Sequence, residues 1–194
     1  MHPHIPPHAE KVFSGVRMDI YQWDQELYDG SMTRFERVRF RDGAFVIWVL
    51  GDGRILMTEQ WQPARHDVFF SLPGGWFDTV DEDPLECAQR ELYEETGYES
   101  DDYELWVVAE WSVNLIGYTY FYIARNCVIR RPHHNPDAGE KIRVFTTDID
   151  EFLSLALDPR FTHSMLIPHM LMSRYESEKY REFQRRISPD NMPK

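Results

Sequence analysis

Apolar residues alternate with polar ones, or form short runs, along most of this 194-residue chain, and this pattern is typical of β-strands. Three Asp-Gly pairs, at positions 29–30, 42–43 and 52–53, separate apolar stretches in the first third. This dipeptide is a strong signal for a hairpin turn, so we expect successive antiparallel strands there. The expected strands cover residues 16–27, 32–40, 44–50, 54–62, 104–113, 118–129 and 141–147, and residues 69–75 are expected to form a short strand that ends in a Pro-Gly-Gly turn.

One segment, Pro84 to Thr96, has the apolar spacing and the ends of a helix. Asp83 can accept hydrogen bonds from the first backbone N–H groups, and Pro84 suits the first helical position. Gly97 suits the residue after the last turn, where a left-handed backbone is common. We expect this helix directly behind a Pro-Gly-Gly turn.

Two further helices are expected near the end of the chain, at residues 148–157 and 162–187, and Pro168 either begins or kinks the second one. Antiparallel strands interrupted by helices favour an α/β fold in which helices pack on both faces of a mixed sheet. The expected division is a flexible tail at 1–10, an N-terminal antiparallel β-ribbon at 11–41, and a catalytic domain with a C-terminal helix at 42–194.

Composition limits the kind of partner. The formal net charge of −12 argues against a surface that binds nucleic acid, which is usually basic. No apolar run reaches the length that crosses a membrane, and the first residues lack an apolar signal core. Two cysteines, Cys87 and Cys127, are too few for a disulfide framework and suit a reducing compartment, so we expect a cytoplasmic protein.

The helix at 84–96 gathers acidic residues in an unusual way. Glu91, Glu94 and Glu95 occupy one arc beside its apolar stripe, and Arg90 is spaced to pair with Glu94. Clustered carboxylates raise one another's pKa values and cost stability unless a counter-charge lies among them. We therefore expect the carboxylates to converge on a divalent cation, and Mg²⁺ suits oxygen ligands that also face substrate phosphates. The alternative is a solvated acidic face.

The surrounding stretch, LPGGWFDTVDEDPLECAQRELYEETGY at residues 72–98, closely resembles the Nudix box, Gly-x5-Glu-x7-Arg-Glu-U-x-Glu-Glu-x-Gly-U, in which U is a bulky apolar residue. The second half of the pattern, from Glu82 to Tyr98, matches at every position. In the first half, six residues separate Gly75 from Glu82, where the family pattern has five. The resemblance implies a Nudix α/β/α sandwich that hydrolyses a diphosphate linked to another moiety.

The resemblance also implies roles for individual residues. Glu91 and Glu95 correspond to the principal metal ligands, and Glu94 to a ligand of a further ion. Arg90 corresponds to the residue that orients the glutamates, and the backbone carbonyl of Gly74 to a further metal ligand. The implied cofactor is Mg²⁺, with Mn²⁺ as a possible substitute, and the implied attack is by an activated water.

Residues 11–24, 52–75 and 140–155 are similar to the ADP-ribose pyrophosphatase and nucleotide-sugar hydrolase branch of this family. That branch implies a homodimer held by the N-terminal strands. It also makes Glu140 the candidate catalytic base on a loop, with Asp137 as the alternative.

The same similarity implies a small nucleoside-diphosphate substrate. Arg65, Trp61 and Gly75 are the candidate substrate-binding residues, although arginines usual in this branch are replaced by Glu59 and Gln62. We expect an Mg²⁺-dependent pyrophosphohydrolase that cleaves ADP-ribose or a related nucleotide sugar to a nucleoside monophosphate and a sugar phosphate. The alternatives are a catalytically weak nucleotide-binding module and a pyrophosphohydrolase of RNA or dinucleotides.

Overall fold

The structure is a computed structural model that describes residues 5–63, 65, 67–130 and 141–188. The strands are β1 (Glu10–Ser14), β2 (Met18–Glu26), β3 (Met32–Phe40), β4 (Gly43–Leu50), β5 (Ile55–Trp61), β6 (Phe69–Ser71), β7 (Gly74–Trp76), β8 (Tyr98–Glu99), β9 (Asp102–Glu110), β10 (Leu115–Ile116), β11 (Tyr118–Ile129) and β12 (Lys141–Thr147). The helices are α1 (Pro84–Thr96), α2 (Ile149–Ser154), the short 3-10 helix Leu155–Leu157, α3 (Ile167–Tyr175) and α4 (Ser177–Ile187).

The strands form two sheets. The smaller sheet has the order β1-β2-β3-β10, and the larger one has the path β12-β5-β4-β11-β8, with β6 beside β5, β7 beside β4 and β9 beside β11. Its two central strands, β4 and β11, run parallel, whereas β5 and β12 pair antiparallel. The larger sheet is therefore mixed, as the sequence predicted.

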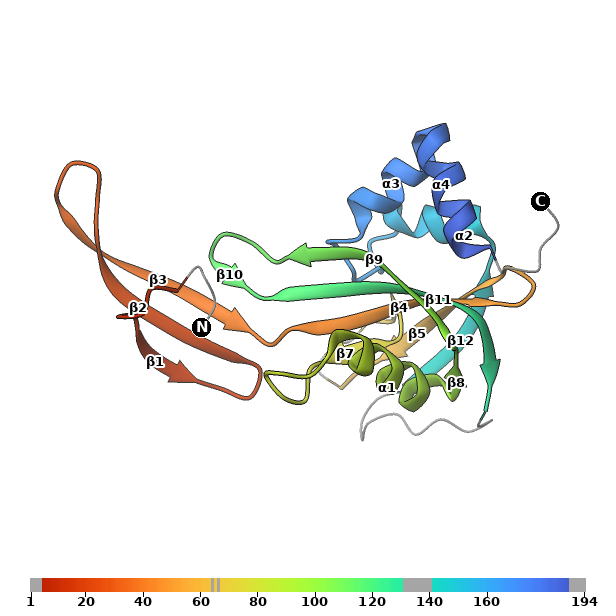
Figure 1. The fold of residues 1–194 in the computed structure, drawn as a ribbon, viewed down its shortest axis with the longest axis horizontal. Helices are drawn as coiled ribbons and strands as arrows, with labels where there is room; N and C mark the ends of the chain where they lie inside the picture. The colour runs from red at the N-terminus through yellow and green to blue at the C-terminus, as the bar shows by residue number, and fades with distance from the viewer. Residues whose placement is uncertain (1–4, 64, 66, 131–140, 189–194) are drawn as a thin grey trace.

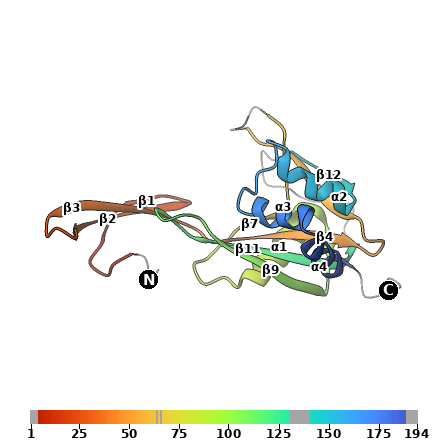
Figure 2. The ribbon, with the colours of Figure 1, turned by 90° about the horizontal axis from the view of Figure 1, so that it is seen from above.

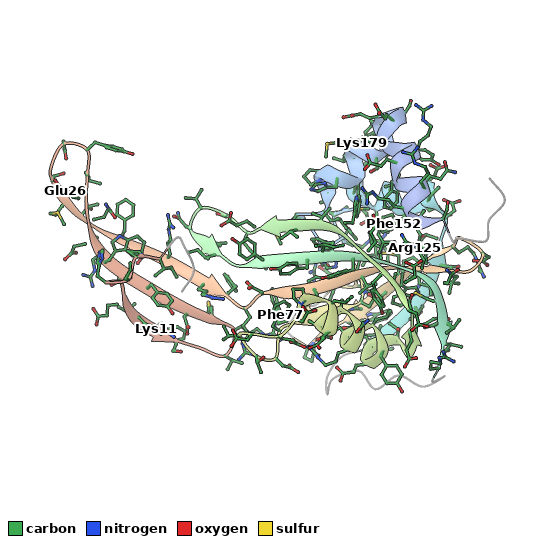
Figure 3. The ribbon with its side chains drawn as sticks, viewed as in Figure 1. Lys11, Glu26, Phe77, Arg125, Phe152 and Lys179 are labelled. Carbon is green, nitrogen blue, oxygen red and sulfur yellow. The ribbon has the colours of Figure 1, made fainter. Side chains whose placement is uncertain are left out.

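Helices cover both faces of the larger sheet (Figure 1). On one face, Trp48 and Leu92 belong to a core cluster beneath α1. On the other, Phe121 and Phe152 belong to a larger cluster beneath α2, α3 and α4, and Figure 3 places Phe152 in this layer. Alternate residues of β4 and β11 supply the two clusters, because successive side chains of a strand point to opposite faces. The predicted α/β/α sandwich is confirmed.

The three-stranded part of the smaller sheet projects from one end of the molecule as a ribbon (Figures 1 and 2). All five residues of β1 and most of the outer halves of β2 and β3 are exposed. The ribbon begins at Glu10, and Ile5 is buried, so ordered structure starts inside the stretch predicted as a flexible tail.

The Asp42-Gly43 pair does not form the hairpin that the sequence predicted. β3 pairs within the ribbon and β4 pairs within the larger sheet, so the chain passes from one sheet to the other here. The Asp42 carboxylate accepts a hydrogen bond from the backbone N–H of Tyr118 at 2.8 Å. A Cβ on Gly43 would lie 2.7 Å from the carbonyl oxygen of Gly75 and 3.1 Å from the Trp76 ring. Gly43 therefore permits close packing of β4 on β7. The pairs at 29–30 and 52–53 do join antiparallel strands.

The segment 69–75, predicted as a short strand that ends in a Pro-Gly-Gly turn, contains the strand β6, and its glycines begin a second strand, β7. β6 ends at Ser71, which pairs with Thr58 of β5, and β7 begins at Gly74, which pairs with Phe45 of β4. The chain therefore crosses from one neighbouring strand to another at Leu72 and Pro73, and the Pro-Gly-Gly signal marks the break without identifying the new partner.

The C-terminal region also differs from its prediction. Residues 162–166 are not helical, Pro168 lies in the first turn of α3, and the helix ends at Tyr175 before α4 begins. Proline suits this position because the first turn has no use for its missing N–H. In the described part of the chain, no helix is both long enough and apolar enough to cross a membrane.

Replacing Gly43 with alanine is expected to lower the free energy of unfolding by about 1–3 kcal/mol, because overpacking forces the backbone to shift. Gly51→Ala is the matched control, since a Cβ there meets nothing within 4 Å. Urea denaturation of the two variants and the parent measures the difference. Equal stability of both variants would contradict the close packing of β4 on β7.

Candidate active site

Helix α1 carries the acidic residues and is held firmly at both ends. The Asp83 carboxylate accepts hydrogen bonds from the backbone N–H groups of Leu85 (2.8 Å) and Glu86 (3.3 Å). Gly97 ends the helix in a left-handed conformation with φ of 74°. Both ends lie where the sequence placed them, so the positions of the glutamates along the helix are fixed by local signals.

Glu91 lies directly against the glycine strand β7. A Cβ on Gly75 would stand 2.4 Å from Glu91 Oε1 and 2.6 Å from its carboxyl carbon. Any side chain at position 75 would therefore displace this carboxylate. The glycine brings a half-buried acid close to the backbone at the edge of the sheet.

The guanidinium of Arg90 lies among the acidic groups. It donates hydrogen bonds to Glu91 at 2.8 Å, to Glu94 at 3.3 Å and to Glu82 at 3.2 Å, and also to the backbone carbonyl of Trp76 at 3.4 Å. A planar guanidinium suits this task because it offers five donors in a fixed plane. Arg90 thus ties three box carboxylates and β7 together, which agrees with the orienting role implied by the family.

Glu95 faces a different partner. Its carboxylate accepts a hydrogen bond from the backbone N–H of Gly74 at 3.1 Å, and the residue is only 9% exposed. Two carboxylates one helical turn apart, Glu91 and Glu95, are therefore both seated on the adjoining glycines of β7.

Burial shifts the titration of this site. It raises the pKa of Glu91, and Arg90 only partly offsets that effect. Burial alone would lower the pKa of Arg90, but the carboxylates of Glu82 and Glu91 outweigh it and raise this pKa. Burial also raises the pKa of the Cys87 thiol to about 12, with Glu82 and Glu91 adding to the effect. Cys87 is therefore a protonated, buried filler beside the site.

The carboxylates do not converge as the sequence led us to expect. Glu91 and Glu94 both turn to Arg90, whereas Glu95 turns to Gly74. Among residues 5–63, 65, 67–130 and 141–188, no three His, Cys, Asp or Glu side chains are gathered as a ready metal cluster. In this conformation the Arg90 guanidinium supplies a counter-charge to Glu91 and Glu94.

All three glutamates and both glycines line one cleft with a volume of about 1110 Å³. Its walls also carry Arg17 and Arg65, and in the described part of the chain neither forms an ion pair. The cleft therefore places acidic groups of α1 near cationic groups that are free to meet an anion.

The loop between β7 and α1 absorbs the extra residue of the box. The Glu82 carboxylate reaches back to accept a hydrogen bond from the Asp78 backbone N–H at 2.6 Å, and Arg41 donates to the carbonyls of Phe77 and Asp78 at 3.3 and 3.4 Å. Glu82 therefore keeps its contact with Arg90 although the loop is longer.

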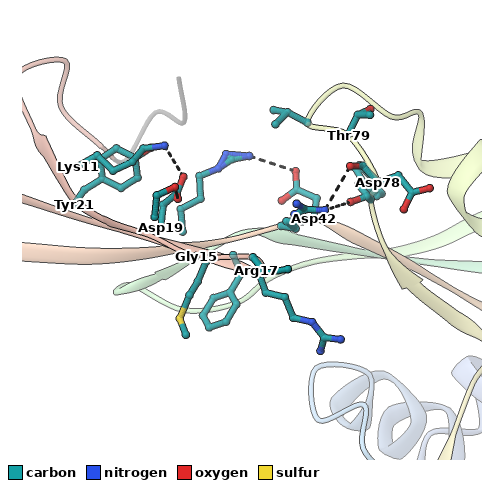
Figure 4. Close-up of a pocket in the computed structure, with 16 residues that line it drawn as sticks. Lys11, Gly15, Arg17, Asp19, Tyr21, Asp42, Asp78 and Thr79 are labelled. Carbon is teal, nitrogen blue, oxygen red and sulfur yellow. Dashed lines mark hydrogen bonds and ion pairs between the residues drawn. The ribbon is translucent and has the colours of Figure 1, made fainter. Parts of the chain in front are cut away.

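A second cavity of about 410 Å³ lies between this loop and the base of the ribbon (Figure 4). Lys11 and Asp19 form an ion pair at 2.7 Å on its ribbon side, while Asp78 and Thr79 line the loop side. None of the three α1 glutamates lines it, so the chemistry of the site belongs to the larger cleft.

Of the remaining candidate residues, one lines the cleft, one does not, and two lie outside the described part of the chain. Arg65 lines the cleft with its guanidinium 4.7 Å from the Phe69 ring centre. Trp61 is not in the described lining, and Lys141 lies over its ring at 5.1 Å. Glu140 and Asp137 fall outside the described residues.

Two residues differ from the arginines usual in the branch. Glu59 is paired with Arg143 of β12 at 2.5 Å, and Gln62 lines the cleft.

Sequence reasoning missed several residues that build the site. Arg17, Arg41 and Trp76 line the cleft, and His163 enters it from the far end of the chain. Trp76 lies within the box stretch, at a position that the box pattern leaves open, whereas Arg17, Arg41 and His163 lie outside it and reach the cleft through contacts between distant segments.

The α/β/α sandwich thus presents an acidic helix, packed on a glycine turn, at the wall of a large cleft. A sequence model of the NUDIX domain matches residues 39–161, which is more than half of the chain. The protein belongs to the Nudix family. It is a Nudix hydrolase of the ADP-ribose pyrophosphatase type, and members of this family use divalent metal ions and act on small nucleoside-diphosphate substrates.

Individual relatives agree with this placement. The methanol dehydrogenase activator of Bacillus methanolicus is 27% identical over 82% of this chain and 86% of its own length. The ADP-ribose pyrophosphatase of Bacillus subtilis (strain 168) is 35% identical over 46% of this chain and 48% of its own. A crystal structure titled ADP compounds hydrolase superposes with a TM-score of 0.72 at 17% identity, covering 92% of each chain, and so shares the fold.

Gly75→Ala is expected to slow hydrolysis of a nucleoside-diphosphate substrate by about 10- to 100-fold, because the new Cβ displaces the Glu91 carboxylate and a small misplacement is costly in catalysis. Gly51→Ala again serves as the control. Steady-state kinetics with Mg²⁺ measures the loss of activity, and thermal denaturation shows whether the variant has also lost overall stability. Unchanged kinetics in Gly75→Ala would mean that Glu91 does not need this position.

Proposed function

We propose that the protein is an Mg²⁺-dependent pyrophosphohydrolase that cleaves the diphosphate of ADP-ribose or a related nucleoside-diphosphate sugar, giving a nucleoside monophosphate and a sugar phosphate. The observation that carries this proposal is the seating of Glu91 and Glu95 on Gly75 and Gly74 at the edge of a large cleft. This arrangement places two acids of one helix in the lining of the same cleft.

The residues present suit a hard divalent cation. Glu91, Glu94 and Glu95 offer carboxylate oxygens, and the Gly74 carbonyl is a further oxygen donor on the same edge. Magnesium prefers oxygen ligands and is commonly held by a few carboxylates together with substrate phosphates. The glycine cradle at position 75, which a Cβ would fill, lets these donors approach one another and a phosphate.

When bound, Mg²⁺ supplies Lewis acidity toward the diphosphate oxygens and lowers the pKa of water. The protein's own residues prepare this chemistry. Arg90 restrains Glu91 and Glu94 through its hydrogen bonds, so these acids are oriented before substrate arrives. The Gly74 N–H restrains Glu95 in the same way. Glu140 is our proposed catalytic base, with Asp137 as the alternative.

The cleft suits a diphosphate that carries two bulky groups. Its volume of about 1110 Å³ exceeds the range of roughly 300–1,000 Å³ usual for small-ligand pockets. Arg17 and Arg65 supply positive charge to the wall of the cleft in a chain that is acidic overall, and this charge supports the binding of a diphosphate there. The aromatic residues Trp76 and Trp111, whose rings stack at 5.6 Å, give it an apolar wall.

Glu95→Gln is expected to lower kcat by several orders of magnitude while leaving the fold intact, because glutamine can still accept the Gly74 hydrogen bond but carries no charge. Glu86→Gln, on the exposed side of the first turn of α1, is the matched control. The assay measures phosphatase-coupled phosphate release with Mg²⁺ from ADP-ribose, other nucleotide sugars, a dinucleotide and a capped RNA fragment.

Near-normal activity of Glu95→Gln would refute the metal assignment. Absence of turnover of every substrate by the parent protein would favour a nucleotide-binding module. Preference for the dinucleotide or the capped RNA would replace the nucleotide-sugar assignment.

We further propose that the protein is a cytoplasmic homodimer in which the ribbon contacts the partner. The free cysteines, both buried, agree with a reducing compartment. Val12, Phe13 and Met32 expose apolar surface on the ribbon, and an exposed strand edge readily pairs with another chain.

Phe13→Glu is expected to shift the protein from dimer to monomer, because a charge would have to be buried in the contact. Leu157→Glu is the control, since this exposed apolar residue lies on the catalytic domain. Size-exclusion chromatography with light scattering reads out the mass of each. A parent protein with the mass of one chain would refute the dimer.

A further inference from the structure

The backbone between β6 and β7 lacks strand pairing directly before the glycines of the active site. Ser71 is the last residue paired with β5, and Gly74 is the first residue paired with β4. Leu72 and Pro73 between them belong to neither strand. A shift in the backbone of these two residues would move Gly74, and with it the Glu95 carboxylate that accepts the Gly74 hydrogen bond.

Three successive backbone groups of this crossing are each held by a different part of the protein. The Leu72 N–H donates to His163 Nε2 at 3.0 Å, the Pro73 carbonyl accepts from the Val46 N–H at 2.9 Å, and the Gly74 N–H donates to Glu95 Oε2 at 3.1 Å. The bond from Val46 is ordinary backbone pairing, and the bond to Glu95 belongs to the site. The bond to His163 is made by a side chain that is distant in sequence from the crossing and from helix α1.

His163 is fixed in the state that this bond requires. A backbone N–H can only donate, so Nε2 is the acceptor and the ring proton lies on Nδ1. The side chain is buried, and its ring lies 4.4 Å from the Phe45 ring centre and 5.6 Å from that of Phe121. Burial lowers the pKa of His163 to about 3, so the ring stays neutral at physiological pH.

Further buried polar groups support the same strand. Ser71 Oγ lies 3.0 Å from His163 Nε2, and the Thr58 hydroxyl donates to the Ser71 carbonyl at 2.8 Å. Gln60 in turn donates to the Thr58 hydroxyl at 3.1 Å. All four side chains are buried, and a buried polar network that is satisfied fixes one geometry. An apolar residue in place of His163 would leave the Leu72 N–H without this acceptor.

We propose that His163 is a positioning residue of the active site, which acts through the Leu72 N–H to fix the backbone of Gly74 and the carboxylate of Glu95. This proposal rests on the proposed function, in which Gly74 and Glu95 are assigned as metal-binding groups. His163 Nε2 is used by Leu72, so this atom does not bind the substrate.

Three substitutions separate positioning from simple packing. Glutamine places its amide near the position of Nε2 and so keeps an acceptor for the Leu72 N–H. Asparagine places its amide near the position of Nδ1 instead. Leucine fills the space and offers no acceptor. His169→Asn is the matched control, because His169 lies on α3 beside Trp106 and outside the described cleft lining.

His163→Asn is expected to lower kcat by about 10- to 100-fold with little change in KM, since misplacement of the site by a fraction of an ångström slows the chemical step. His163→Gln is expected to retain most of the activity at similar thermal stability. Without substrate, hydrogen exchange at the Leu72 and Gly74 amides should quicken in the asparagine and leucine variants, and Mg²⁺ binding by calorimetry should weaken.

Parent-like exchange, Mg²⁺ binding and kcat in His163→Asn would overturn the proposal. So would equal losses in the glutamine and asparagine variants that follow their thermal stability, because packing alone would then explain them. Exchange and Mg²⁺ binding do not depend on the substrate. If the parent protein hydrolysed nothing in the panel, the proposed function would fail while these two measurements still decided the role of His163.

Discussion

The carboxylate of Glu91 lies directly against the backbone of Gly75, and this contact decides how the rest of the site is built. It requires a residue without a side chain at position 75 and a helix that begins at a fixed distance behind the turn. It also brings a half-buried acid close to Glu94 and Glu95, which is stable only with a counter-charge at hand. Arg90 provides one, and its position explains why the acids are ordered and yet not gathered on one point.

The elements that the sequence predicted well are those that local signals define. Asp83, Pro84 and Gly97 marked the ends of α1, and the structure places the helix between them. The Asp-Gly pairs at 29–30 and 52–53 also formed turns between antiparallel strands. A helix end or a tight turn depends on a few adjacent residues, so its chemistry can be read directly.

Features that depend on distant segments could not be predicted in this way. Gly43 belongs to an Asp-Gly pair, but the close approach of Gly75 and Trp76 decides its role. The parallel pairing of β4 with β11 and the identity of the new partner after Leu72 and Pro73 leave no local pattern. The candidate site divides similarly: the box residues were predicted from one motif, while His163 and Arg41 entered only through the fold.

The central claim is that the acids on α1 and the glycines of β7 together bind a divalent cation that faces a diphosphate. Anomalous diffraction from crystals soaked in Mn²⁺, which substitutes for Mg²⁺ and can be identified by its scattering, tests this most directly. We expect a manganese peak in contact with the carboxylates of Glu91 and Glu95. Well-ordered crystals with no peak at this edge of the sheet, or with manganese bound only elsewhere, would contradict the claim.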